Sequence, residues 1–170
     1  MIDQNVVEEL GKIGQLWRHP GKVLPLKVAK QPIIESNLAK LKRMDSGWSF
    51  DLWTADFASD DDFKTCWIPS TQTNTNYLTV IFNEETEINT IGFVESTNPS
   101  KFPVPLKTRI LSYSLQYWAG NKWNDIKIET QKQLLRMHHF GSVRTGKIRL
   151  NLENFEAGAG IAELLVYNEK

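Results

Sequence analysis

Short apolar runs separated by turn residues make up the chain from about Ser36 onward. Runs of this kind, rich in β-branched and aromatic residues, are typical of strands. The residues between Ala119 and Lys122 form a hairpin turn signal, Gly-Asn, between two of these runs. Because no helical pattern separates the runs, we expect an all-β fold, an antiparallel β-sandwich of the jelly-roll type. The expected strands are residues 77–82, 87–94, 109–117, 123–128, 147–152 and 162–167.

The N-terminal part of the chain has a different pattern. Apolar residues between positions 3 and 17 recur three and four apart, as on one face of a helix. Pro20 and Gly21 then end the periodicity, and a proline-punctuated stretch follows. We therefore expect three parts: a short N-terminal helix at 1–19, a linker at 20–36 and a β-sandwich at 37–170.

Composition excludes several classes of partner. The 170 residues carry 20 basic and 20 acidic side chains, so the net charge is zero and no electrostatic footprint for nucleic acid exists. Apolar runs are too short for a membrane-spanning helix. A single cysteine, Cys66, excludes an internal disulfide and a zinc site built from several cysteines. We expect Cys66 to be a small buried residue.

Two distant segments carry oxygen ligands suited to a hard cation. Asp60, Asp62 and Thr65 lie close together in one acidic loop, and Ala162-Glu163 places a carboxylate inside the last apolar run. Ca²⁺ takes six to eight oxygen ligands of this kind, from side chains and backbone carbonyls. We expect a structural calcium ion held by Asp60, Thr65 and Glu163 side chains and by the backbone of Asp62 and Ala162. The alternative is an acidic turn that is only solvated, since Asp-rich turns are common.

These same segments resemble the two ends of a galactose-binding-like domain of the discoidin or coagulation-factor type C family. In that family a loop of the form A-x-D-G-x-x-x-T-x-W meets a final strand of the form A-E-[apolar]-x-V-Y. Asp61 stands where the family usually has glycine. The matching positions here are Ala58, Asp60, Thr65, Trp67, Ala162, Glu163 and Tyr167.

Further segments match the family in order along the chain. They are Asn37-Leu-Ala39, the strand that begins at Arg109, the hairpin Gly120-Asn-Lys-Trp123, and Lys147-Ile-Arg-Leu150. The resemblance implies a jelly-roll-like sandwich that serves as a carbohydrate-binding module, with its ligand on loops at one end. It implies a galactosyl or fucosyl glycan as the partner.

Residues 10–17 carry a second, shorter resemblance. Leu10-Gly-Lys-Ile-Gly-Gln-Leu-Trp17 is similar to the last helix of the catalytic barrel of bacterial α-L-fucosidases, although Leu16-Trp17 reverses the usual order. This resemblance implies that the chain is the C-terminal module of a glycoside hydrolase, next to a preceding catalytic domain. It also implies a periplasmic or extracellular location.

Sugar binding requires an exposed ring together with convergent hydrogen-bonding groups. The expected rings are Trp118, at the edge of a hairpin, and Phe102, between Lys101 and Pro103. Because His138 and His139 are adjacent, only one of them can face the core of a strand. Trp67, Tyr113, Trp123 and Phe140 are expected in the core. The full set of expected ligand residues is Trp118, Phe102, Arg109, His138, His139 and Asn74.

No catalytic motif occurs, neither G-x-S-x-G nor H-E-x-x-H nor a glycine-rich phosphate loop. We therefore expect a non-catalytic module. Two other readings stay open: a structural buttress for the catalytic barrel with no ligand of its own, and a protein-recognition domain. A cluster of exposed aromatic and polar loop residues favours the module, and a large apolar patch favours the buttress.

Overall fold

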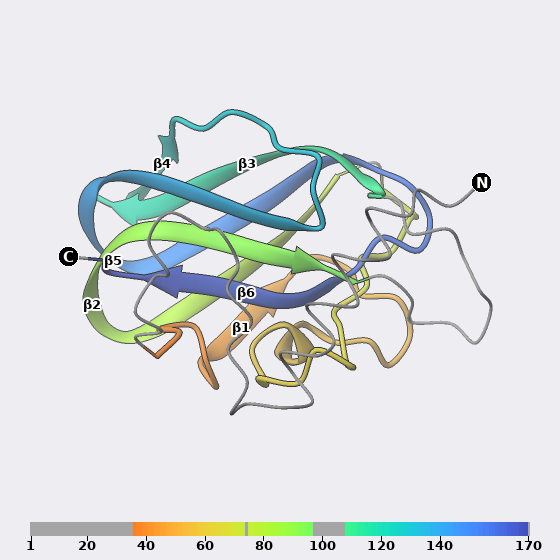
Figure 1. Cartoon of the computed structure of the whole chain (residues 1–170). Helices are drawn as coiled ribbons and strands as arrows, with labels where there is room; N and C mark the ends of the chain where they lie inside the picture. The colour runs from red at the N-terminus through yellow and green to blue at the C-terminus, as the bar shows by residue number, and fades with distance from the viewer. Residues whose placement is uncertain (1–35, 74, 97–107, 170) are drawn as a thin grey trace, which may run out of the picture.

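The computed structural model describes residues 36–73, 75–96 and 108–169. The expected helix, nearly all of the linker, Asn74 and Phe102 lie outside these residues. Within them the chain forms six strands and one short 3₁₀ helix (Figure 1). In chain order these are β1 (Arg43–Ser46), η1 (Ala55–Ala58), β2 (Asn76–Glu95), β3 (Ile110–Ala119), β4 (Lys122–Ile126), β5 (Leu135–Phe155) and β6 (Ile161–Tyr167).

Two long strands, β2 and β5, each take part in both layers of a β-sandwich. The first part of β2 lies between β1 and the second part of β5, in the order β1-β2-β5-β3-β4. The last part of β2 pairs instead with β6 on one side and with the first part of β5 on the other. Both strands bend around the same end of the molecule, at the left of Figure 1. The all-β sandwich expected from the sequence is confirmed.

The hydrophobic core lies between the two layers. Every second residue of the central strands is buried, as in Leu78 and Val80 of β2 and Ile148 and Leu150 of β5. The other layer contributes Leu164 and Val166 of β6. Trp67, Tyr113 and Cys66 are buried as expected.

Trp123 differs from the expectation of a core position. It is half-buried, and the register with Trp118 places it on the outward face of the β3–β4 hairpin. Strand alternation, rather than the size of the ring, decides that it does not enter the core. Phe140 is half-buried and packs against the core, as expected.

Asn37 closes the free edge of β6. Its side-chain amide donates to the Leu164 carbonyl and accepts from the Val166 N–H, both at 2.9 Å. The Leu38 N–H also donates to the Val166 carbonyl. A short segment thus pairs with an edge strand that would otherwise expose unpaired backbone groups.

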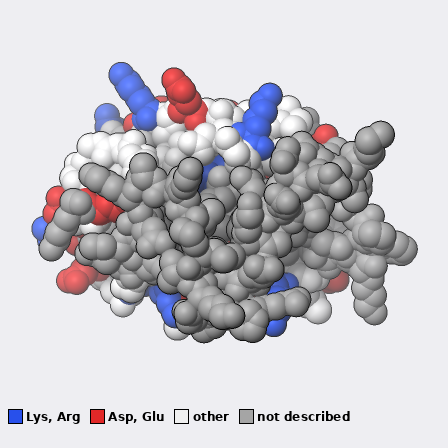
Figure 2. Space-filling model, viewed as in Figure 1, with Lys and Arg blue, Asp and Glu red and all other residues white. Residues whose placement is uncertain are grey.

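The described surface carries mixed charge. In Figure 2, Lys and Arg side chains stand beside Asp and Glu side chains along the upper rim, with no field of one sign. Among the described residues no helix is long and apolar enough to cross a membrane.

Candidate functional site

The acidic loop after η1 brings three oxygens together. Thr65 Oγ1 lies 2.7 Å from Asp60 Oδ2 and 2.7 Å from the Asp62 carbonyl oxygen. The Asp62 N–H donates to Asp60 Oδ1 at 2.9 Å. Asp61 has a φ of +65°, which glycine adopts freely and aspartate tolerates better than most residues. The loop therefore keeps its left-handed turn although it has aspartate at that position.

Glu163 of β6 faces this loop from the other side. The residue is 1% exposed, and its Oε2 has no hydrogen-bond partner among the described residues. The pKa of Glu163 is raised to about 8, mainly by burial and in part by the nearby charges of Asp60 and Asp61. The backbone of Asp61 and the ammonium of Lys40 act in the opposite direction. A cation bound here would give the unpaired Oε2 a partner and would offset the repulsion between Glu163 and the neighbouring carboxylates.

The residues between the acidic loop and β6 fit a hard cation only if hydroxyl and backbone oxygens act as ligands beside the carboxylates. Within the described residues no three His, Cys, Asp or Glu side chains are grouped so that they could hold a metal by themselves. Such an ion would also need the Thr65 hydroxyl and backbone carbonyls, as Ca²⁺ commonly does. Ala162, expected to contribute its carbonyl, precedes Glu163 in β6, and its side chain packs against Cys66 and Ile68.

A second candidate site is an open pocket of about 520 Å³ on the outward face of the larger layer. Its floor is a row across three strands, in which Tyr77 of β2 pairs with Asn151 of β5, and Asn151 pairs with Ser114 of β3. Residues opposite one another in a sheet point to the same side. Glu153 of β5 and Thr73 and Thr75, which precede β2, complete the polar lining.

Trp48 forms the rim of this pocket. Its carbonyl oxygen accepts the Asn76 Nδ2–H at 2.7 Å and the Ser70 N–H at 2.8 Å. Its side chain is 70% exposed, so a fixed backbone presents a free ring. A Cβ on Gly47 would lie 2.3 Å from Asn76 Oδ1, and this close approach therefore requires glycine.

The pocket combines two aromatic side chains with hydroxyl, amide and carboxylate groups. Its volume lies within the range of about 300–1,000 Å³ that small-molecule sites have. Ser, Thr, Asn and Glu can donate or accept hydrogen bonds to hydroxyl groups. Glu153 is the one carboxylate among the described lining residues, so the pocket lacks the acid pair of a glycosidase. The arrangement suits binding of a polyhydroxylated molecule.

The expected ligand residue Asn74 lies outside the described residues, so its place relative to this pocket stays a prediction. Thr73 and Thr75, which line the pocket, were not expected. Trp48, Tyr77, Ser114, Asn151 and Glu153 were missed. The last three become neighbours only through strand register, which the sequence does not give. The signal available for Trp48 was its position directly after the turn residue Gly47.

The structure separates the expected ligand residues Trp118 and Arg109. They stand at opposite ends of β3, about 30 Å apart for nine residues of extended strand. Trp118 is half-buried, and its ring makes an edge-on contact with Trp123 at 5.2 Å between centroids. Arg109 is buried, and its backbone N–H donates to Glu95. These two residues cannot share one ligand site.

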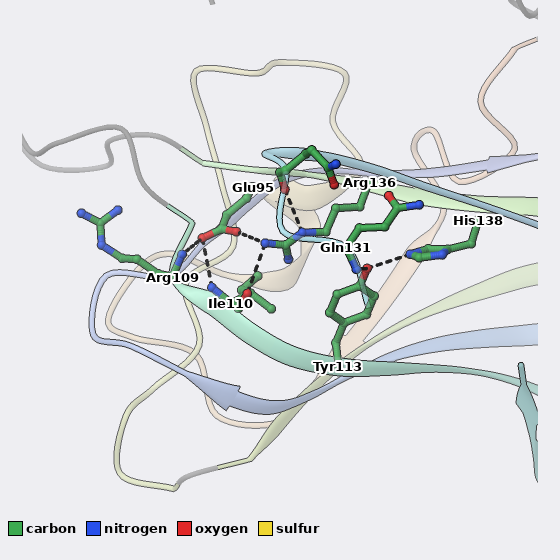
Figure 3. Close-up of polar contacts among 8 residues, drawn as sticks. Glu95, Arg109, Ile110, Tyr113, Gln131, Arg136 and His138 are labelled. Carbon is green, nitrogen blue, oxygen red and sulfur yellow. Dashed lines mark hydrogen bonds and ion pairs between the residues drawn. The ribbon is translucent and has the colours of Figure 1, made fainter. Parts of the chain in front are cut away.

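Of the two adjacent histidines, only His138 faces inward, as expected. His138 is buried, and its Nε2 lies 2.8 Å from the Tyr113 hydroxyl (Figure 3). His139 is exposed, and its Nδ1 lies 3.1 Å from Thr90 Oγ1 and 3.2 Å from Glu169 Oε2. Both line a small recess of about 290 Å³ beside Gln131 and Met137, away from the larger pocket.

Figure 3 shows the hydrogen-bonded pair of His138 and Tyr113 beside a second buried polar cluster at the ends of β2, β3 and β5. Glu95 accepts from the backbone of Arg109 and Ile110 and pairs with Arg136 Nη2 at 2.8 Å. Arg136 is fully buried and also lies over the rings of Phe93 and Tyr113. The contacts of Glu95 join the end of β2 to the starts of β3 and β5. This cluster was not expected from the sequence.

Solved structures share this fold. The chain resembles chitosan-binding module 1 of a chitosanase/glucanase from Paenibacillus sp. IK-5 (TM-score 0.65, 16% identity, 79% of this chain and 100% of that one). It resembles CpGH89CBM32-5 from Clostridium perfringens, solved with GalNAc-β-1,3-galactose (TM-score 0.64, 19% identity, 78% and 99%). A putative α-L-fucosidase from Bacteroides thetaiotaomicron matches with TM-score 0.65 and 16% identity over 79% of this chain but only 29% of that one.

Comparison with curated proteins found no match. A family model of the F5/8 type C domain matches residues 40–164, which include the acidic loop, both long strands and the start of β6. The order of the strands and the position of Glu163 opposite the acidic loop agree with the resemblance seen in the sequence. The chain belongs to the F5/8 type C domain family.

Proposed function

We propose that the chain is a non-catalytic carbohydrate-binding module that holds a neutral sugar in the pocket formed by Trp48, Tyr77, Asn151 and Ser114. The observation that carries this proposal is the exposed Trp48 ring, which stands on a fixed backbone beside a row of polar side chains. A sugar has an apolar C–H face that stacks on a ring and hydroxyls that need donors and acceptors.

The fold comparisons support the class of ligand. One similar structure is named as a chitosan-binding module, and another was solved with GalNAc-β-1,3-galactose. We propose a galactosyl or fucosyl glycan as the partner of this chain. The similarity to part of a putative α-L-fucosidase supports a parent glycoside hydrolase with a preceding catalytic domain. We propose that this parent protein lies in the periplasm or outside the cell.

Binding at this pocket would rest on few groups. Trp48 would stack on one face of the sugar, and Asn151, Ser114 and Glu153 would hydrogen-bond its hydroxyls. An open pocket buries a sugar only partly, so affinity would be weak and reversible. Such binding would keep a catalytic domain close to its glycan.

We also propose that Ca²⁺ is bound between the acidic loop and β6. Asp60, Thr65 and Glu163 would supply side-chain oxygens, and Asp62 and Ala162 would supply carbonyls. The orphaned Oε2 of Glu163 is the observation that favours an ion over a solvated turn. The ion would neutralise the buried carboxylate and fasten the loop to the last strand.

A glycan array followed by calorimetry tests the ligand proposal. We expect binding to a galactosyl or fucosyl glycan that weakens about tenfold or more in Trp48→Ala, since a lost stacking contact of about 1.4 kcal/mol corresponds to that factor. Phe50→Ala is the matched control, because Phe50 is exposed in the same loop but does not line the pocket. Equal losses in both variants would contradict the proposed site.

A structural buttress is the second candidate function. Leu41, Phe50 and Leu52 are large apolar side chains that are more than half exposed and lie outside the pocket lining. A neighbouring domain could cover them, and this exposure favours a supporting role. Absence of binding to every glycan on the array would overturn the module and leave the buttress.

A further inference from the structure

Arg149 of β5 occupies a fixed position on the outward face, next to the sugar pocket. Its guanidinium carbon lies 4.1 Å from the ring centroid of Tyr77 and 4.1 Å from that of Trp123. Its Nε donates to Thr79 Oγ1 at 2.9 Å. Contacts with two ring faces and one hydroxyl hold the planar cation in a defined orientation.

This cation has no acidic partner in the part of the chain that the structure describes. The ion pairs found there join Lys40 to Asp61, Arg136 to Glu95, His139 to Glu169 and Arg144 to Glu85. The residues opposite Arg149 in register, Thr79 and Gln116, are neutral. Aromatic rings, rather than a carboxylate, lie against the Arg149 guanidinium.

Arg149 lies directly beside the pocket, because both are in contact with Tyr77. Tyr77 belongs both to the pocket floor and to the Arg149 contact. Beyond Arg149 lie Trp123 and Trp118, and Lys147 Nζ lies 5.4 Å from the Trp118 ring. We name this set of residues, Tyr77, Arg149, Trp123, Trp118 and Lys147, the outer strip.

We infer that the outer strip binds an acidic sugar, one that carries a carboxylate or sulfate group, joined to the neutral sugar in the pocket. The inference rests on the proposed carbohydrate-binding function and extends it to the class of glycan. Glu153 in the pocket repels an anion there, whereas Arg149 and Lys147 attract one farther along β5. The carboxylates in the same row as Arg149, Asp45 and Asp125, are each two strands away from it. The planar fork of a guanidinium matches carboxylate and sulfate oxygens, and the half-buried rings of Trp118 and Trp123 lie beside it.

The test uses two matched pairs of probes in calorimetry with the wild-type chain. One pair is trigalacturonate and its neutral methyl ester, and the other is a sulfated galactan oligosaccharide and its desulfated form. We expect the anionic member of at least one pair to bind about tenfold tighter, as a charge-assisted contact provides, and added salt to reduce the difference. The pair that responds identifies carboxylate or sulfate.

Variants then locate the effect. Arg149→Gln is expected to remove the preference for the anionic probe while binding of the neutral probe continues. Arg144→Gln removes the same charge from an exposed side chain elsewhere on β5 and is expected to keep the preference. Arg149→Lys keeps the charge but loses the planar fork, and we expect it to retain only part of the preference for the anionic probe. Melting curves check that each variant is folded.

Nuclear magnetic resonance of the wild-type chain gives a readout that needs no variant. The anionic probe is expected to shift the Trp123 indole signal, and the neutral probe is expected to shift it less. Equal binding of anionic and neutral probes, or an unchanged preference in Arg149→Gln, overturns the acidic-sugar inference while the module stands. No binding of any probe overturns both the inference and the proposed function.

Discussion

His138 is held neutral by the groups around it. The Tyr113 oxygen already accepts the Gln131 N–H at 3.1 Å, so its own proton is available to His138 Nε2. Burial lowers the pKa of His138, and the positive charge of Arg136 and the neighbouring His139 lower it further. A proton added to this ring would remove the acceptor for Tyr113 and place a second cation beside Arg136.

Stability should therefore fall in mildly acidic solution. The folded-state pKa of His138 lies below its ordinary value of about 6.5, so the unfolded chain takes up a proton first as the pH drops. The stability that neutral His138 contributes is fully present above a pH of about 6.5 and is lost as the pH falls below it. Urea unfolding at pH 7.5 and 5.0 should show a larger loss for the wild type than for His138→Gln.

His139→Gln serves as the control for this pH dependence, since His139 is exposed and is the smallest of the three causes that lower the pKa of His138. We expect it to keep most of the wild-type pH dependence. Identical profiles for His138→Gln and the wild type would show that His138 does not titrate as described.

Individual residues differ in how well the sequence reveals their role. Glu163 could be singled out, because a lone carboxylate inside an apolar run is unusual and matches a family motif. Glu95 could not, because its partner Arg136 is 41 residues away, in a part of β5 that was not expected to be a strand. A carboxylate is recognised as buried and paired only once its partner's position is known.

At the scale of elements, β2 packs closely against the first part of β5 near Gly92. Gly92 lies where the β2 backbone passes Met137. A Cβ at this position would lie 2.4 Å from the Arg136 carbonyl oxygen and 2.2 Å from Met137 Sδ. The backbone oxygen cannot move without shifting the strand.

Gly92→Ala should lower the free energy of unfolding by about 1–3 kcal/mol, as overpacking of a filled interior does. Gly146→Ala is the control, since a Cβ there meets no atom within 4 Å and the backbone φ is not positive. We expect Gly146→Ala to be neutral or to stabilise by up to about 1 kcal/mol. Denaturant titration measures both, and equal effects would contradict the described packing.

The sequence predicted strands where apolar residues are dense. The expected segments at 77–82 and 87–94 are present but form one strand, because Asn83, Glu84 and Glu85 continue the β2 backbone as an exposed bend. The first part of β5 and the short β1 were not expected, since polar residues and Gly141 interrupt their apolar pattern. Backbone pairing with a long neighbour, rather than local pattern, keeps these segments extended.

At the scale of the whole molecule, the acidic loop connects two distant parts of the chain. Segment 58–65 lies against β6, and the hydrogen bonds of Trp67 with Ile161 continue this contact. Only Asn37 and the backbone of Asp61 hydrogen-bond the Glu163 carboxyl within the described residues. A bound ion would therefore hold the start and the end of the sandwich together.

Calcium should raise the melting temperature, and a chelator should reverse the increase. Binding to the folded state alone adds about 2.7 kcal/mol at a concentration one hundred times the dissociation constant. Glu163→Gln should abolish most of this effect, because a neutral amide is a poor calcium ligand. Asp45→Asn changes an exposed carboxylate of β1, and this variant should keep the increase in melting temperature with calcium. A calcium response no larger than the response to magnesium, or unchanged in Glu163→Gln, would contradict the proposed ion.

The central claim is that the outward pocket of the larger layer binds sugar. The most direct measurement is a titration of the isotope-labelled chain with galactose and with GalNAc-β-1,3-galactose, followed by nuclear magnetic resonance. We predict that the largest shifts fall on the Trp48 indole, Tyr77, Ser114 and Asn151, the residues that line the pocket. Shifts confined to another face, or none with either sugar, would contradict the claim.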